Sequence, residues 1–88
     1  MKISIAEGAN QMITLHLEGK LTGKWVECLA NACEDASKNA ARVSIDMKNV
    51  TFVDREGIIL LSNMGGCGIE ILNPPAYIAD QIRNAAST

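Results

Sequence analysis

Few side chains in this sequence of 88 residues could carry out chemistry. His16 is the single histidine, and it stands in a segment where apolar and polar residues alternate, as they do in a strand. A nucleophilic serine or cysteine needs a general base within hydrogen-bond reach, and one strand histidine identifies no Ser–His or Cys–His pair. We therefore expect no enzyme activity and no catalytic residue.

The three cysteines offer no metal site. Cys28 and Cys33 lie five residues apart on a predicted helix, so their side chains point in different directions. No C-x-x-C pair or other zinc-binding spacing occurs. An odd number of cysteines within apolar patterns is typical of reduced thiols in a cytoplasmic protein. We expect no metal and no cofactor.

Composition argues against several other classes of protein. The length fits one domain, residues 1–88, and 48% hydrophobic with 20% charged residues is typical of a soluble globular protein. A net charge of −2 without a basic stripe, and only one residue each of Trp, Tyr and Phe, argue against nucleic-acid binding. No apolar run reaches the length of a membrane span, and the N-terminus has no signal-peptide core. We expect a cytoplasmic protein without membrane insertion.

The spacing of apolar residues predicts strands and helices in alternation. Strands are expected over 3–5, 12–18, 43–47 and 69–72, and helices over 24–39, over 54–64 and after 73–75. A short turn at 8–10 favours an antiparallel hairpin, whereas strands separated by helices prefer to be parallel. The predicted fold class is α/β: a small mixed, mostly parallel sheet of about four strands with helices mainly on one face.

Local signals predict the ends of the helices and the bare face of the sheet. Thr22 is the candidate N-cap of the first helix and Asp54 that of the second, which Gly65 and Gly66 should end. The last helix should bury one stripe, Ile78, Ile82 and Ala85. The polar residues that alternate with the apolar ones predict a barer sheet face made of Ser4, Thr14, His16, Ser44 and Glu70.

The most informative stretch runs from residue 50 to residue 58. Asp54 can accept hydrogen bonds from free amides of the second helix, and the helix dipole stabilises both Asp54 and Glu56. On the residues alone, this is a well-capped helix. However, residues 58–61 are all apolar, so the helix is either enclosed by the core or exposes an apolar patch beside Arg55. Such a patch would be a protein-docking surface.

Two motifs resemble the STAS domain family, the fold of anti-sigma factor antagonists that also occurs in sulphate-transporter tails. Residues 17–22 (LEGKLT) are similar to the family's L-x-G-x-L-D/T. Residues 43–57 (VSIDMKNVTFVDREG) are similar to its hydrophobic-D-L-x-x-V-x-F-h-D-S-S-G. The resemblance covers nearly the whole chain. It implies a small sheet with helices on one side, which binds an anti-sigma kinase or another cytoplasmic partner and is switched by phosphorylation of a serine before the helix glycine.

The sequence departs from the family pattern at that switch. Arg55 and Glu56 stand where the family has two serines, and the usual phosphorylated serine aligns with Glu56, which has no hydroxyl. A carboxylate carries one negative charge where phosphoserine carries about −1.5 to −2, so Glu56 would resemble a permanent, weaker phosphorylation. Thr22 stands where an aspartate is common in the partner-binding loop. The final strand–helix pair of longer members is missing, which would open a sheet edge to homodimerisation.

We therefore predict a non-catalytic regulatory module that binds a protein partner. The predicted partner-binding residues are Thr22, Asp46, Asp54, Arg55, Glu56, Gly57 and Ile58. Two alternatives stay open: the small cytoplasmic STAS subunit of an ABC-type lipid transport system, and a weak nucleotide- or small-molecule-binding module. The second alternative has little support, because no phosphate-binding glycine loop opens a helix and the only nearby cations are Lys20, Lys24 and Lys48.

Overall fold

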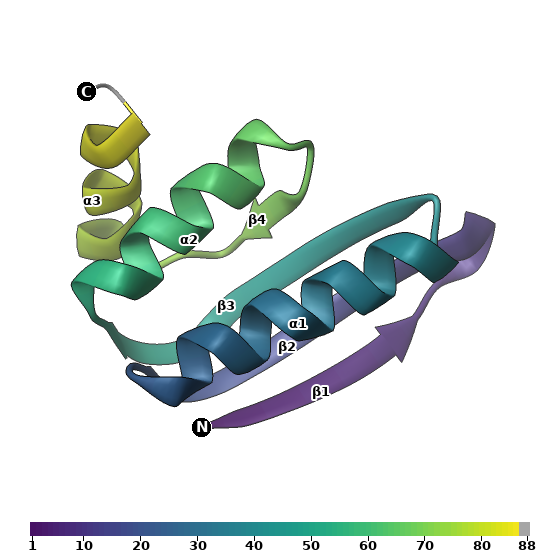
Figure 1. Cartoon of the computed structure of the whole chain (residues 1–88), viewed down its shortest axis with the longest axis horizontal. Coiled ribbons are helices and arrows are strands. Elements are labelled where there is room, and N and C mark those ends of the chain that lie inside the picture. Colours follow the sequence, from purple (N-terminus) through teal and green to yellow (C-terminus); the bar gives the residue numbers. More distant parts are fainter. Residues whose placement is uncertain (87–88) are drawn as a thin grey trace.

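A computed structural model describes residues 1–86. Its elements are β1 (Lys2–Glu7), the short 3-10 helix η1 (Ala9–Gln11), β2 (Met12–Leu21), α1 (Lys24–Asn39), β3 (Arg42–Val53), α2 (Arg55–Gly66), β4 (Glu70–Leu72) and α3 (Ala76–Ala86). The strands form one sheet in the order β1-β2-β3-β4, with β1 antiparallel to β2 and the other neighbours parallel (Figure 1). The predicted α/β class with a mixed, mostly parallel sheet is confirmed. Over residues 1–86, no helix combines the length and hydrophobicity that a membrane crossing requires.

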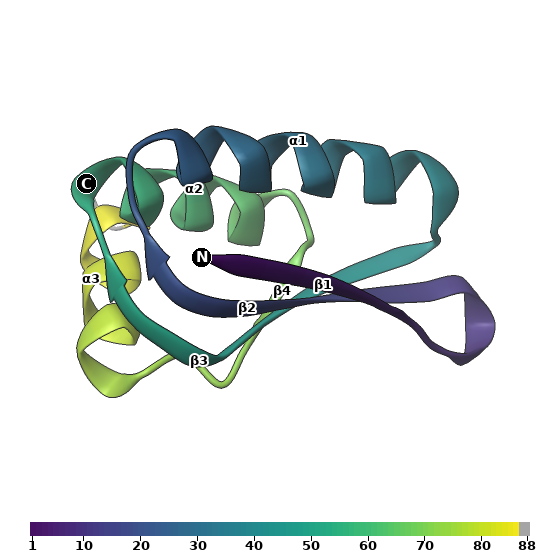
Figure 2. The same ribbon diagram turned by 90° about the horizontal axis from the view of Figure 1, so that it is seen from below.

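The helices α1 and α2 lie over one face of the sheet, as predicted (Figure 2). The C-terminal ends of β2 and β3 curve toward these helices, and α3 packs against α2 beside the end of β3. The pairing of β2 with β3 shifts register between His16 and Glu18 and again between Gly19 and Lys20. Such bulges bend a strand and increase its twist, which accounts for the curvature.

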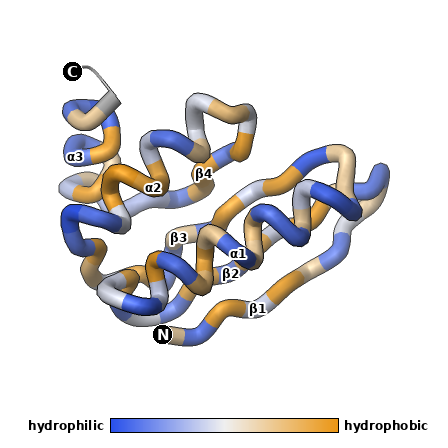
Figure 3. Tube along the Cα trace, in the orientation of Figure 1, coloured by the Kyte–Doolittle hydropathy of each residue, from blue (hydrophilic) through white to orange (hydrophobic). Residues whose placement is uncertain are grey.

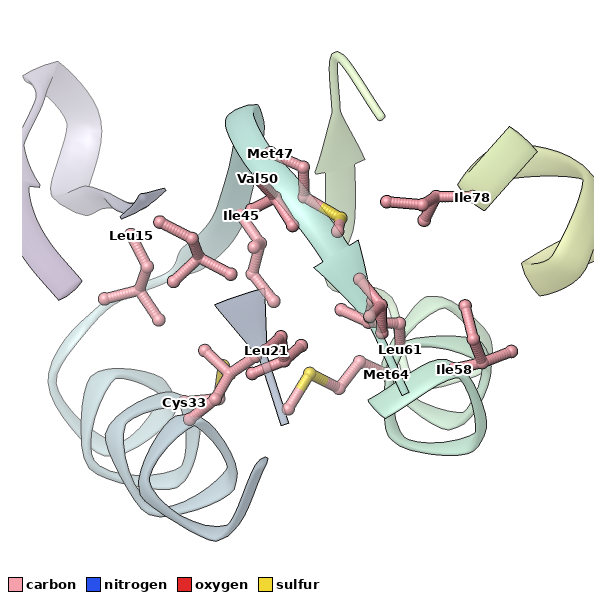
Figure 4. Close-up of a cluster of buried hydrophobic side chains, with 13 residues drawn as sticks. Leu15, Leu21, Cys33, Ile45, Met47, Val50, Ile58, Leu61, Met64 and Ile78 are labelled. Carbon is pink, nitrogen blue, oxygen red and sulfur yellow. The ribbon is translucent and has the colours of Figure 1, made fainter. Parts of the chain in front are cut away.

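The core fills the space between the sheet and the helices (Figure 4). In α3, Ile78 is fully buried, while Ile82 and Ala85 pack against the same cluster, so the predicted stripe is confirmed. Burial of one such aliphatic side chain contributes about 1.5–3 kcal/mol, so α3 is an integral part of the domain. The largest fully buried hydrophobic side chains are Leu15, Leu17, Leu21, Leu29, Ile45, Met47, Leu61 and Ile78.

The apolar run at the start of α2 is mostly enclosed. Ile58 and Leu61 are buried and Leu60 is half-buried, whereas Ile59 is 42% exposed. Figure 3 shows this run as a hydrophobic segment directly after the hydrophilic start of α2. The sheet, α1 and α3 all contact α2. Of the two alternatives for this helix, enclosure by the core holds for three of the four residues.

The strands differ from the sequence prediction in two respects. First, β2 and β3 do not end at residues 18 and 47, because residues 19–21 pair with residues 50–53. The segment expected to connect β3 to α2 is therefore strand. Second, Ser44 is only 2% exposed, although its side chain was expected on the barer face. It lies on the inner strand β3, between Thr14 of β2 and Glu70 of β4.

The ends of two helices also differ from expectation. Thr22 does not cap α1. Gly23 occupies the N-cap position with a positive φ of 55°, which glycine adopts without steric cost. Thr22 contributes its carbonyl oxygen, which accepts a hydrogen bond from Trp25 N at 3.0 Å. Gly65 and Gly66 belong to the last turn of α2, and Cys67 is the C-cap residue.

Candidate functional site

Asp54 joins the two loops that carry most of the predicted partner-binding residues. Its Oδ1 accepts a hydrogen bond from Gly57 N at 2.8 Å, which confirms Asp54 as the N-cap of α2. Its Oδ2 accepts one from Gly23 N at 3.0 Å, at the start of α1. In addition, Asp54 N donates to Leu21 O at 3.1 Å. We call the surface formed by Thr22, Gly23, Asp54, Arg55 and Glu56 the loop junction.

Gly57 is required at this site by its close contact with β3. A β-carbon at this position would stand 2.5 Å from Val53 Cγ1, closer than real β-carbons approach other atoms. It would also lie 3.3 Å from Asp54 Oδ1 and from Leu21 O. Glycine therefore allows the first turn of α2 to sit directly on the ends of β2 and β3, within reach of the Asp54 carboxylate.

The loop junction carries charges of both signs. Arg55 and Glu56 are exposed in the first turn of α2, whereas Thr22 and Asp54 are half-buried. The N-terminal end of the α2 dipole stabilises the two carboxylates, Asp54 and Glu56. The structure thus brings together Thr22, Asp54, Arg55, Glu56 and Gly57, five of the residues that were predicted to bind a partner.

A pocket of about 460 Å³ adjoins the loop junction between β3, α2 and α3. Ile58, which is 8% exposed, contributes to its wall and is otherwise a core residue. Four lining residues were not predicted as site residues: Phe52, which is 47% exposed, the buried Val53, and Gln81 and Asn84 of α3. In the sequence, Gln81 and Asn84 are simply polar residues of the last helix, and residues 52 and 53 are part of the second motif. Neither feature indicates where α3 packs.

Asp46 has a separate set of partners at the bend of β3. Its Oδ1 accepts hydrogen bonds from Lys48 N at 3.0 Å and from Asn73 Nδ2 at 3.4 Å, and its Oδ2 lies 3.1 Å from His16 Nδ1. The Lys48 hydrogen bond, followed by Asn73 and the nearby His16, lowers the pKa of Asp46. None of these partners belongs to the loop junction, so the structure does not bring Asp46 together with the other predicted site residues.

The remaining reactive side chains do not gather at this site. Cys33 is buried, and burial raises the pKa of its thiol to about 11, which disfavours the nucleophilic thiolate. Cys28 and Cys67 are exposed. Over residues 1–86, no three His, Cys, Asp or Glu side chains come close enough together to hold a metal ion.

No protein-family model matches the sequence, and a search of the curated proteins finds no match. Among solved structures, the chain is similar to the anti-sigma factor antagonist SpoIIAA in its unphosphorylated form, with a TM-score of 0.72 and 18% identity over 93% of this chain and 82% of that chain. It is also similar to SpoIIAA in its phosphorylated form, described as a Bacillus cell fate determinant, with a TM-score of 0.73 and 16% identity over 96% and 83% of the two chains. A third structure, Mglu, gives a TM-score of 0.64 and 19% identity over 83% of this chain but 19% of that one. The STAS-like fold implied by the two motifs is confirmed.

Proposed function

We propose that this chain is a non-catalytic regulatory module that binds a cytoplasmic protein partner through the loop junction, in the manner of an anti-sigma factor antagonist. One observation carries the proposal. The carboxylate of Asp54 hydrogen-bonds to Gly23 N and Gly57 N at once, so the starts of α1 and α2 form a single preorganised surface. Preorganised loops lose less conformational freedom on binding, which favours affinity.

The side chains around Asp54 suit protein recognition. Phe52 exposes an aromatic ring beside Arg55, and both line the adjoining pocket. Aromatic residues and arginine are enriched in protein interfaces, where a desolvated centre is surrounded by a polar rim. Both oxygens of Asp54 already accept backbone hydrogen bonds, so its carboxylate has a structural role and is poorly placed to act as a general base.

The fold similarity supports a regulatory role of this kind. SpoIIAA is an anti-sigma factor antagonist with a phosphorylated and an unphosphorylated form. In the present chain, Glu56 occupies the position that the motif assigns to the phosphorylated serine, and it is exposed. We infer that its fixed charge replaces a phosphorylation switch, so that the partner meets a surface whose charge does not change.

Charge-reversal variants of two exposed residues test the proposal. The wild-type chain captures its partner from a native lysate, and the purified partner is then titrated by calorimetry with wild type, Arg55→Glu and Glu56→Lys. Each variant should weaken binding at least about tenfold, which corresponds to about 1.4 kcal/mol. Glu34→Lys, an exposed position on α1, is the matched control and should bind like wild type.

The identity of the captured protein separates the pathways open to such a module. A kinase or sigma-factor regulator would agree with the antagonist role, whereas a subunit of an ABC-type lipid transporter would assign the same surface to transport. Equal affinity of all four proteins for the partner would contradict the role of the loop junction. Binding of ATP or GTP tighter than about 100 µM, or about −5.5 kcal/mol, would point instead to a nucleotide-binding module.

A further inference from the structure

The strand β1 is an open edge of the sheet. It pairs only with β2, without a register shift, and five of its six residues are exposed. Edge strands are usually protected by prolines, bulges or charges in their middle, because their free N–H and C=O groups can pair with another chain. In β1 the sequence KISIAE has charges only at its two ends. The other edge, β4, has only three residues.

An apolar groove runs along this edge. Ile5 points to the same face as the core yet is 62% exposed, the highest value among the large hydrophobic residues of the described chain. It lines a groove of about 420 Å³ between β1 and α1, together with Ile13, Ala32 and Ala36, and the polar residues Glu7, Asp35 and Asn39 complete the wall. Figures 1 and 2 show that α1 lies over β2 and β3 and that no helix or strand of residues 1–86 lies beyond β1. The groove is therefore open on the side of the free edge.

We propose that this edge binds a second copy of the chain, so that β1 pairs with β1 of the partner in antiparallel orientation and the two sheets become continuous. The sequence of β1 is complementary to itself in this arrangement. With a two-fold axis at Ser4, Ile3 of each copy lies opposite Ile5 of the other copy. Side chains that face the core in one copy then lie beside side chains that face the core in the other. Lys2 of each strand then lies opposite Ala6 of the other, so no two like charges stand directly opposite each other.

A different register and a parallel orientation fit less well. A two-fold axis at Ile5 would place Glu7 opposite Ile3 of the partner and bury a carboxylate beside an apolar side chain, which is costly. Parallel pairing would bring Lys2 beside Lys2 and Glu7 beside Glu7. In the Ser4-centred dimer, the isoleucines of both copies form one apolar row that closes the groove against α1. The dimer does not rest on the proposed function, because the loop junction lies at the start of α1 and α2.

Sedimentation equilibrium of the full chain tests the dimer. The mass should rise from 9.4 kDa toward twice that value between about 1 µM and about 1 mM, the range expected of a small interface. Ile5→Lys should raise the dissociation constant at least about tenfold, because it places a charge in the apolar row. Ile59→Lys makes the same change at an exposed position of α2 and should leave the dimer unchanged.

A cross-linking experiment tests the register. In a Cys28→Ser/Cys67→Ser background, Ser4→Cys places two thiols opposite each other, where α-carbons about 4.5–5.5 Å apart permit a disulfide. Oxidised glutathione accepts the two electrons, and a covalent dimer should form; Lys2→Cys, opposite Ala6 of the partner, should cross-link poorly. A wild-type chain that remains monomeric up to about 1 mM overturns the dimer. Equal cross-linking of the two cysteine variants overturns the Ser4-centred register.

Discussion

Gly57 packs against Val53 so closely that a β-carbon on Gly57 would stand 2.5 Å from Val53 Cγ1. Valine is branched at its β-carbon and stiff, so its methyl group has no inexpensive way to move aside. We expect Gly57→Ala to lower the free energy of unfolding by about 1–3 kcal/mol, as overpacked cores do. Urea denaturation monitored by circular dichroism measures this change.

Gly65→Ala is the matched control in the same helix. A β-carbon on Gly65 would have no neighbour within 4 Å, so the better helix propensity of alanine should raise stability by up to about 1 kcal/mol. The two substitutions should therefore have opposite signs. A gain in stability for both variants would show that Val53 yields to the added methyl group.

The two hydrogen bonds of the Asp54 carboxylate can be separated by substitution. Asp54→Ala removes both and should cost about 2 kcal/mol, the sum of a helix cap and a second hydrogen bond. Asp54→Ser retains one short acceptor for Gly57 N and should cost about half as much. Amide hydrogen exchange should then accelerate at Gly23 but not at Gly57. Equal acceleration at both amides would mean that serine does not cap α2.

The hydrogen bond from Gly57 N to Asp54 could be predicted from the sequence, whereas the one from Gly23 N could not. An aspartate three residues before Gly57, at the start of an apolar run, is a local N-cap signal. The contact with Gly23 joins residues 31 positions apart and depends on the pairing of β2 with β3, which includes two register shifts. Bulges of this kind leave no clear mark on the alternation of apolar residues.

The N-cap of α1 and the pocket beside α3 also depend on features that the sequence pattern does not specify. Thr22 alone was predicted as the N-cap of α1, but Gly23 takes that position with a positive φ, which glycine adopts without steric cost. The stripe of α3 correctly predicted that Ile78 faces the core, but a stripe does not say which elements cover a helix. The pocket formed by Gln81, Asn84 and Phe52 therefore appeared only in three dimensions.

Glu56→Ser tests the fixed charge at the loop junction. The probe is not the captured partner but an anti-sigma kinase whose own antagonist carries a serine at this position. For this kinase, removal of the carboxylate should strengthen docking by about 1–2 kcal/mol, and with ATP as the donor the new hydroxyl should accept one phosphate. Calorimetry measures the affinity, and intact mass measures the phosphate. Glu34→Ser, on the exposed face of α1, should change neither. A Glu56→Ser variant that binds no better and stays unmodified would leave this residue as no more than part of a helix start.

The three cysteines should differ sharply in reactivity. Cys28 and Cys67 are exposed, whereas Cys33 is 3% exposed and burial raises its pKa to about 11. Because the thiolate is the reactive form, the native protein at pH 8 should react with Ellman's reagent quickly at two thiols and slowly at the third. Denaturant should release the slow thiol, and Cys33→Ala should abolish the slow phase. Three fast thiols in native buffer would show that α1 opens readily from the sheet.

Asp46 should make folding stability depend on pH in the acidic range. The Lys48 N–H, aided by Asn73 and His16, lowers the pKa of Asp46 in the folded chain, whereas the unfolded chain has the ordinary value of about 3.9. The folded state therefore gains stability above the unfolded pKa and loses it as the pH falls through the lower, folded pKa. Asp46→Asn should reduce Tm at pH 7, and the difference from wild type should shrink as the solution becomes strongly acidic.

The same measurement distinguishes the Lys48 hydrogen bond from the His16 contact. Since the Lys48 N–H makes the largest contribution, His16→Ala should keep most of the pH dependence of wild type. The exposed position of His16 makes it a mild substitution for the fold. If His16→Ala removes the pH dependence as completely as Asp46→Asn, the ion pair across β2 and β3 sets the pKa of Asp46, and the hydrogen bond at the bulge is secondary.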